Sequence, residues 1–138
     1  MRILGLDVGD RRIGVALSDP GGILATPLTI IERPDDKQAI DAIVSIINQH
    51  QVNKVIVGLP YSMDGSLGLQ ADKVTIFVQH LGTHTNVPIE YRDERLTTVT
   101  AKQLMQEANP RKTKRRERDD AVAAAIILQG YLDEIRQR

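Results

Sequence analysis

Three acidic residues in separate segments of the chain could together do phosphodiester chemistry: Asp7, Glu94 and Asp120. Asp7 interrupts an apolar run at residues 3–8, and an ionised carboxylate is costly to bury unless a partner compensates it. Gly9 follows, and it removes the side chain that would stop a ligand from approaching the backbone. Mg²⁺ and Mn²⁺ prefer oxygen ligands, and two such ions can activate water and stabilise a leaving oxygen. The three residues therefore offer the carboxylates that a metal-dependent nuclease needs.

Asp7 and Glu94 also have ordinary structural explanations. Asp7 could close a turn with the backbone of Gly9. Glu94 could pair on the surface with Arg92 or Arg95. The nuclease interpretation depends on the three carboxylates in combination, because each alone has a simpler role.

Asp120 lies at the start of an expected helix, where Asp is a preferred N-cap residue. The preceding residue, Asp119, could take either the capping role or the ligand role instead. Successive helical residues point about 100° apart, so we do not expect both side chains to face the same site.

A basic run precedes these two residues, although the net charge of the chain is zero. Residues 111–118 contain six of the eighteen Lys and Arg residues. Phosphates respond to such a local stripe even when the overall charge is balanced. A solvated loop between helices is the alternative. The candidate nucleic-acid-binding residues here are Lys112, Lys114, Arg115 and Arg116.

Two isolated arginines, Arg12 and Arg95, are further candidates for holding phosphates of a nucleic acid. The alternative is that each only balances nearby acidic residues. Asp10 would add a negative charge close to Asp7, and its part in metal binding is open at this stage.

The length and composition are typical of one domain, which we expect to span residues 1–138. Three Tyr, one Phe and no Trp argue against recognition of bases by a broad aromatic surface. The absence of Cys excludes disulfides and thiolate metal sites, and it suits a reducing compartment. No window approaches a membrane-spanning length, and the first apolar stretch is too short for a signal peptide. We expect a cytoplasmic protein without a membrane partner.

The hydrophobic pattern predicts three strands, then helix, strand, helix, strand and two helices. Strands are expected at residues 3–8, 13–18, 23–31, 54–60 and 87–91. Helices are expected after Pro34 with Asp35 or Asp36 as the cap, at about 68–81, from Thr97 or Thr98 to Ala108, and at about 120–135. Ligands gather at the carboxyl ends of strands in such sheets, which is where Asp7 and residues 92–95 would lie.

Several short motifs follow one another along the chain in a family-like order. They are LDVG at 6–9, RIGVA at 12–16, VGLP at 57–60, MDG at 63–65, DERLTT at 93–98, DAVAA at 120–124, IILQ at 126–129 and YL at 131–132. With them the chain resembles the YqgF (RuvX) family, bacterial proteins with the ribonuclease H-like fold of Holliday-junction resolvases. The resemblance implies an α/β fold with a mixed five-stranded sheet flanked by helices on both faces.

The resemblance also implies that Asp7, Glu94 and Asp120 are both the catalytic residues and the ligands of Mg²⁺ or Mn²⁺. The implied activity is endonucleolytic maturation of the 5′ end of 16S rRNA, and an older suggestion is cleavage of branched DNA. The chain departs from the family pattern at Asp10 and Arg11, where a small residue and Lys are usual.

Two functions from other classes were weighed. An actin-like phosphotransferase needs two copies of the domain, and a non-catalytic nucleic-acid-binding module has no need of the three carboxylates. The residues themselves choose neither between RNA and DNA nor between a monomer and a homodimer.

Overall fold

The computed structural model describes residues 2–60, 68–94 and 115–136, with the backbone alone described for residues 115–120. These residues form β1 (Arg2–Val8), β2 (Arg12–Ser18), β3 (Ala25–Glu32), α1 (Asp36–Gln49), β4 (Val52–Leu59), α2 (Leu69–Gly82), β5 (Ile89–Asp93) and α4 (Arg115–Arg136). The helix expected from Thr97 or Thr98 to Ala108 lies outside the described residues.

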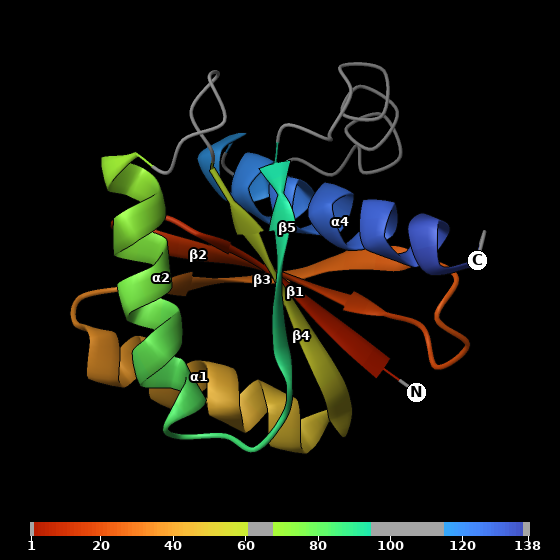
Figure 1. The fold of residues 1–138 in the computed structure, drawn as a ribbon, viewed down its shortest axis with the longest axis horizontal. Coiled ribbons are helices and arrows are strands. Elements are labelled where there is room, and N and C mark those ends of the chain that lie inside the picture. The colour runs from red at the N-terminus through yellow and green to blue at the C-terminus, as the bar shows by residue number, and fades with distance from the viewer. Residues whose placement is uncertain (1, 61–67, 95–114, 137–138) are drawn as a thin grey trace.

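The sheet is mixed, and its strand order is β3-β2-β1-β4-β5. The first three strands pair antiparallel, whereas β1 with β4 and β4 with β5 pair parallel. Helices α1 and α2 cover one face of the sheet and α4 covers the other (Figure 1). The predicted five-stranded α/β fold is confirmed for the described part of the chain.

Alternation along β1 decides which face receives each side chain. Leu4, Leu6 and Val8 enter the larger core cluster with α1 and α2. Ile3 enters the smaller cluster with α4, and a Cβ on Gly5 would meet α4 as well. Asp7 therefore lies on the face of the sheet that α4 covers.

The two helices on the other face follow their sequence signals closely. The Asp35 carboxylate accepts a hydrogen bond from the Gln38 amide at 2.8 Å, so Asp35 is the N-cap of α1. The cap of α2 is Gly68, one residue before the helix begins. The apolar stripes of both helices are buried, as period-3.6 patterning predicts. They consist of Ala39, Ile40, Ile43 and Ile47 in α1, and Ala71, Val74, Phe77, Val78 and Leu81 in α2.

Helix α4 runs in the direction opposite to β4. Its Ile127 lies against Gly58 near the end of β4, and its Tyr131 hydroxyl accepts a hydrogen bond from Lys54 near the start of β4 at 3.1 Å. Leu128 approaches β1 so closely that a Cβ on Gly5 would lie 2.8 Å from its Cβ. The first turns of α4 therefore point toward the carboxyl ends of β1 and β4.

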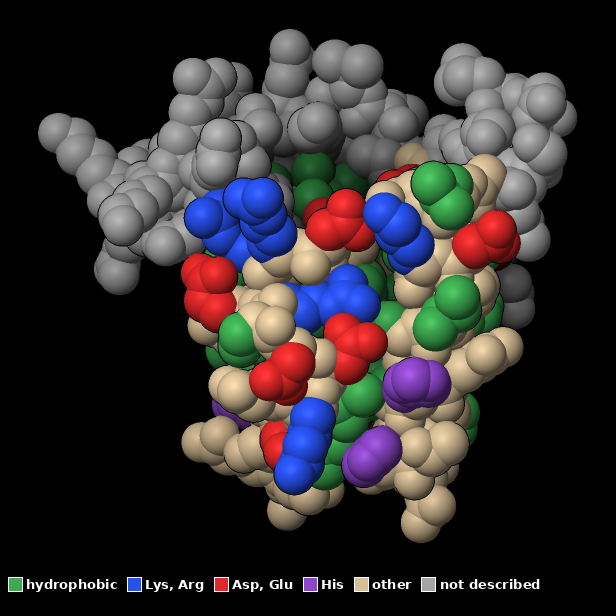
Figure 2. Space-filling model, turned by 90° about the vertical axis from the view of Figure 1, so that its left-hand side faces the viewer, with side chains coloured by type: hydrophobic (Ala, Val, Ile, Leu, Met, Phe, Trp, Pro, Cys, Tyr) green, Lys and Arg blue, Asp and Glu red, His purple; other side chains and the backbone are tan. Residues whose placement is uncertain are grey.

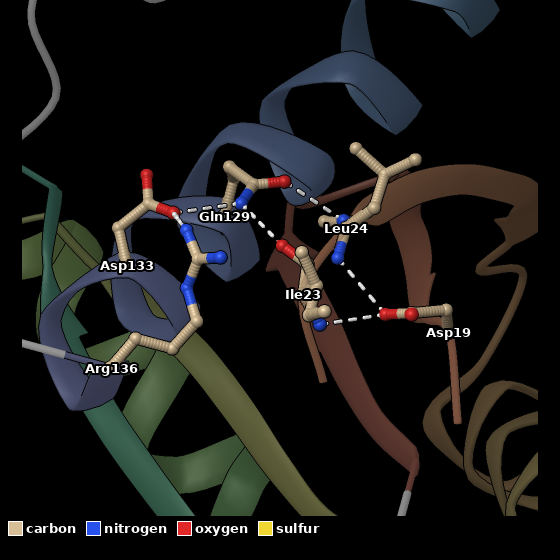
Figure 3. Close-up of polar contacts among 7 residues, drawn as sticks. Asp19, Ile23, Leu24, Gln129, Asp133 and Arg136 are labelled. Atoms are coloured by element: carbon tan, nitrogen blue, oxygen red, sulfur yellow. Dashed lines mark hydrogen bonds and ion pairs between the residues drawn. The ribbon is translucent and has the colours of Figure 1, made fainter. Parts of the chain in front are cut away.

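A side-chain amide fixes α4 on the sheet (Figure 3). The Gln129 Oε1 accepts from the Ala25 amide, and its Nε2 donates to the Ile23 carbonyl, both at 2.9 Å. The Asp19 carboxylate holds the same loop by accepting from the amides of Leu24 and Ile23, and these hydrogen bonds lower the pKa of Asp19. The expectation that the third strand begins at Ile23 was therefore wrong, because Asp19 takes the amides of both residues before Ala25.

Other element boundaries also differ from the prediction. Helix α4 begins at Arg115 rather than near residue 120, since no Gly or Pro interrupts residues 115–120 and Arg and Glu are good helix formers. Strand β5 begins at Ile89 rather than Val87, because Pro88 has no amide and joins the sheet only through its carbonyl, which accepts from Val55. None of the helices in the described residues has the length and apolar character to cross a membrane.

Candidate active site

The carboxyl ends of three parallel neighbours, β1, β4 and β5, meet at one edge of the sheet. Asp7 is the penultimate residue of β1, and Glu94 follows the last residue of β5. The two side chains share a hydrogen bond across β4. Residues far apart in the sequence thus form one carboxyl pair at the position that the parallel topology predicts for a ligand site.

Gly58 of β4 makes this pairing possible. A Cβ at Gly58 would lie 2.7 Å from Glu94 Oε1 and 2.4 Å from the Cδ1 of Ile127. The Glu94 carboxyl therefore lies directly over the glycine. The sequence analysis did not single out Gly58 as a site residue, although a glycine inside an apolar strand is a known signal of close approach.

The environment makes ionisation of Glu94 unfavourable. Burial is the largest cause, followed by the charge of Asp7, the hydrogen bond with Asp7 and the charge of Asp93, and together they raise the pKa of Glu94 to about 7. Without a cation, the pair therefore shares a proton near neutral pH. A cation bound between the carboxylates would favour their ionised forms, because opposite charge reverses the effect of a like-charged neighbour.

The turn after Asp7 does not depend on its side chain for closure. The Gly9 amide donates to the Arg12 carbonyl at 2.9 Å. The next carboxylate, Asp10, lies 3.7 Å from the Nζ of Lys73 on α2. Asp10 thus pairs with the helix layer on the face opposite to Asp7.

The surface pairing suggested for Glu94 and Arg92 is not what the structure shows. Arg92 forms an ion pair with Glu134 of α4. Its guanidinium also lies against α4, with Nε 3.0 Å from where a Cβ on Gly130 would be. Arg92 connects β5 to α4, and Glu94 faces Asp7 instead.

The capping interpretation of Asp119 and Asp120 is wrong. Both residues lie inside α4, whose first residue is Arg115, so neither is at the N-cap. Their side chains are outside the described part of the structure. Among the described side chains, no group of three or more His, Cys, Asp or Glu could hold a metal ion.

Arg12 lies on the same face of the sheet as Asp7, because Asp7 pairs with Gly14 and Arg12 is two residues from Gly14 in β2. Its Nε is 3.6 Å from Glu32 Oε1 and has no hydrogen-bond partner. The ion pair agrees with a local balancing role, and the unsatisfied Nε leaves a donor for a phosphate.

The remaining basic candidates are only partly covered by the structure. Arg115 and Arg116 are the first two residues of α4, so the run at 111–118 ends as helix rather than as a loop. The other three lie outside the described residues: Arg95, Lys112 and Lys114.

The face formed by α1 and α2 is a poor candidate for nucleic-acid binding. Figure 2 shows acidic and basic side chains interspersed on this face. A cleft of about 360 Å³ on it has the same mixed lining, which includes Lys73 and Arg33 but also Asp10, Asp35 and Asp36. A phosphate backbone would meet both signs of charge there, which directs attention to the edge with Asp7 and Glu94.

Comparison with protein families decides the family of this chain. The model of the RuvX family, described as Holliday junction resolvase, matches residues 1–134. The chain belongs to this family. A relative from Thermoanaerobacter pseudethanolicus is 48% identical over 139 residues, covering 100% of both chains. Another from Clostridium acetobutylicum is 46% identical over 135 residues, covering 98% of this chain and 100% of the relative. Both are provisionally named pre-16S rRNA nuclease.

Two solved structures share the fold. T. thermophilus RuvC in complex with a Holliday junction substrate has a TM-score of 0.67 at 12% identity, covering 99% of this chain and 96% of RuvC. The Fowlpox virus resolvase in complex with Holliday junction DNA has a TM-score of 0.62 at 14% identity, covering 98% of this chain and 99% of the resolvase. The predictions of a ribonuclease H-like fold, of membership in the RuvX family and of a nuclease are confirmed.

Proposed function

We propose that this nuclease is a divalent-metal-dependent endonuclease that processes the 5′ end of pre-16S rRNA. The observation that carries the proposal is the Asp7–Glu94 pair at the carboxyl edge of the parallel strands. The rRNA substrate comes from the names of relatives that are 46% and 48% identical over nearly the whole chain. An rRNA substrate also agrees with the expected cytoplasmic location.

The carboxyl pair fits a hard divalent cation. Its donors are all oxygen, and the raised pKa of Glu94 reflects like-charge crowding that a cation would relieve. Asp7 and Glu94 would hold Mg²⁺ or Mn²⁺, and Asp120 would be the third ligand because the first turns of α4 point toward this edge. The bound ion would supply an activated water and stabilisation of the leaving oxygen.

The basic candidates would bind and orient the substrate. We assign Arg12 to a phosphate near the carboxyl pair, since it lies on the same face as Asp7. The same role of positioning the substrate through its phosphates, without reading its sequence, is proposed for Arg95, Lys112, Lys114, Arg115 and Arg116.

The test compares two neighbouring substitutions in cleavage of an RNA that carries the 5′ precursor of 16S rRNA. We expect cleavage by the wild type with Mg²⁺ or Mn²⁺, weak cleavage with Ca²⁺ and none in excess EDTA, because Ca²⁺ holds its ligands in a larger and looser geometry. Asp120→Asn should abolish cleavage, whereas Asp119→Asn should retain it, since the two residues point about 100° apart on the helix.

Thermal melting without metal is the control for folding of both variants, and neither should lose stability through a lost cap. Full activity in EDTA would contradict the metal dependence. An Asp120→Asn variant that cleaves, or a folded but inactive Asp119→Asn variant, would show that the third carboxylate is wrongly assigned.

Cleavage of branched DNA is the second candidate function, which the family description favours. The likeness to RuvC and to the Fowlpox resolvase supports the shared fold alone. A four-way DNA junction in the same assay separates the candidates, and sedimentation with each substrate tests for the homodimer that a two-fold junction would favour. Efficient cleavage of the junction with an intact RNA precursor would assign the chain to branched DNA.

A further inference from the structure

The side chain of Arg33, just past the end of β3, connects three parts of the molecule. Its Nη1 donates to the Gly9 carbonyl at 2.7 Å, and its Nε donates to Asp36 in the first turn of α1 at 2.9 Å. Its guanidinium carbon lies 4.6 Å from the centre of the Phe77 ring on α2. With only 13% of the side chain exposed, these contacts hold the guanidinium in one place.

The object held by Arg33 is the turn between β1 and β2. The Arg33 amide donates to the Arg11 carbonyl at 2.9 Å, so both its backbone and its side chain bind this turn. The turn is closed by Gly9 and Arg12, and it begins two residues after Asp7. A carbonyl held by a charged donor is worth more than an ordinary hydrogen bond, particularly where water has little access.

We propose that Arg33 is a positioning residue of the nuclease site: it anchors the Gly9–Arg12 turn and thereby holds Asp7 and Arg12 in place. The inference rests on the proposed function for its effect on cleavage. Arg33 lies on the α1 and α2 side of the sheet, so it acts through the backbone and does not contact the substrate. A displacement of about 1 Å at a reacting group can lower the rate of an enzyme about 100-fold.

Arg33→Met and Arg33→Lys test the proposal. Met keeps much of the length and the packing on Phe77, but it removes the donors. Lys keeps the charge and can reach one acceptor, yet it cannot satisfy Gly9 and Asp36 in the fixed fork of a guanidinium. The matched control is Arg136→Met, which breaks an exposed ion pair with Asp133 at the other end of the fold.

The first measurement is amide hydrogen exchange, which needs neither metal nor substrate. The Gly9 amide should exchange at least about tenfold faster in Arg33→Met, because the turn opens locally. The amides of Leu4 and Leu6 in β1 report global unfolding and should exchange as in wild type. Equal acceleration at Gly9 and in the core, or none at Gly9, would overturn the positioning role.

The second measurement is steady-state cleavage. Arg33→Met should lower kcat about 10- to 100-fold with KM nearly unchanged, Arg33→Lys should lower it less, and Arg136→Met should leave both parameters unchanged. Millimolar guanidinium should restore part of the kcat of Arg33→Met, since Arg33 lines a cleft open to solvent, and it should not affect the control.

A wild-type kcat in Arg33→Met would refute the inference, as would a loss confined to KM. If the wild type itself cleaves neither RNA nor junction DNA, the proposed function fails. The exchange rate of Gly9 still decides whether Arg33 anchors the turn.

Discussion

Replacing Glu94 with Gln should stabilise the metal-free protein at alkaline pH. A protonated Glu94 can share a hydrogen bond with Asp7, and the Gln amide can donate in its place without ever ionising. In the wild type, the free energy of folding that the protonated carboxyl contributes is fully present below about pH 4.5. It is lost as the pH rises through about 7, where Glu94 ionises beside Asp7.

The size of the effect follows from the shift in pKa. A rise from 4.5 to about 7 corresponds to about 3 kcal/mol. Because Glu94 is partly open to water, screening reduces this to about 1.5 kcal/mol. For a chain of this length, the melting temperature of Glu94→Gln should exceed that of the wild type by about 5 °C at pH 8. At pH 5 the two should melt at about the same temperature.

Calorimetric melts in EDTA from pH 5 to pH 8 measure this difference. The control is Glu32→Gln, because the Glu32 side chain is 68% exposed and its ion pair with Arg12 should contribute little at any pH. Mn²⁺ should raise the melting temperature of the wild type at pH 8 and have much less effect on Glu94→Gln. The reasoning fails if Glu94→Gln shows no gain in stability between pH 5 and pH 8 relative to the wild type.

Two further substitutions test the site and its substrate contacts. Gly58→Ala should displace Glu94 or Ile127, lower stability by about 1–3 kcal/mol and sharply reduce cleavage, whereas Gly82→Ala enters open space and should fold and cleave as the wild type does; wild-type activity in Gly58→Ala would contradict the packing argument. Neutralising the basic run should lower the salt dependence of nucleic-acid binding by about 0.7–0.9 in the slope of log K per lost contact, and an unchanged slope after the fourfold substitution would identify the run as a solvated segment. The residues neutralised are Lys112, Lys114, Arg115 and Arg116.

Local patterning predicted the strands and helices whose burial is regular. The apolar alternation of β1 and β2 and the period-3.6 stripe of α1 are visible in the sequence, and Asp35 could be recognised as a cap. The parallel topology also predicted that Asp7 and the residues after β5 share an edge. These features depend on short-range rules, so a single sequence contains the information.

The features that were missed depend on long-range contacts. The start of β3 is set by Asp19 and by Gln129, a residue of α4. The role of Arg33 requires Gly9 and Phe77, which are adjacent to it only in the folded chain. Likewise, the start of α4 was missed because a basic, charged segment predicts helix and solvated loop about equally well without knowledge of its packing.

The covering of one sheet face by α4 alone has a consequence for how the protein is made. Ile3, Ala16, Ala25 and Ile56 on that face are covered by α4, and their partners in it extend to Leu132. A growing chain on the ribosome thus exposes Asp7 and the apolar face long before the helix that covers them is synthesised. Domains generally complete their fold only when such distant contacts can form. The catalytic edge would then assemble late in synthesis, so that a nuclease acting on RNA is not active while its own message is still being read.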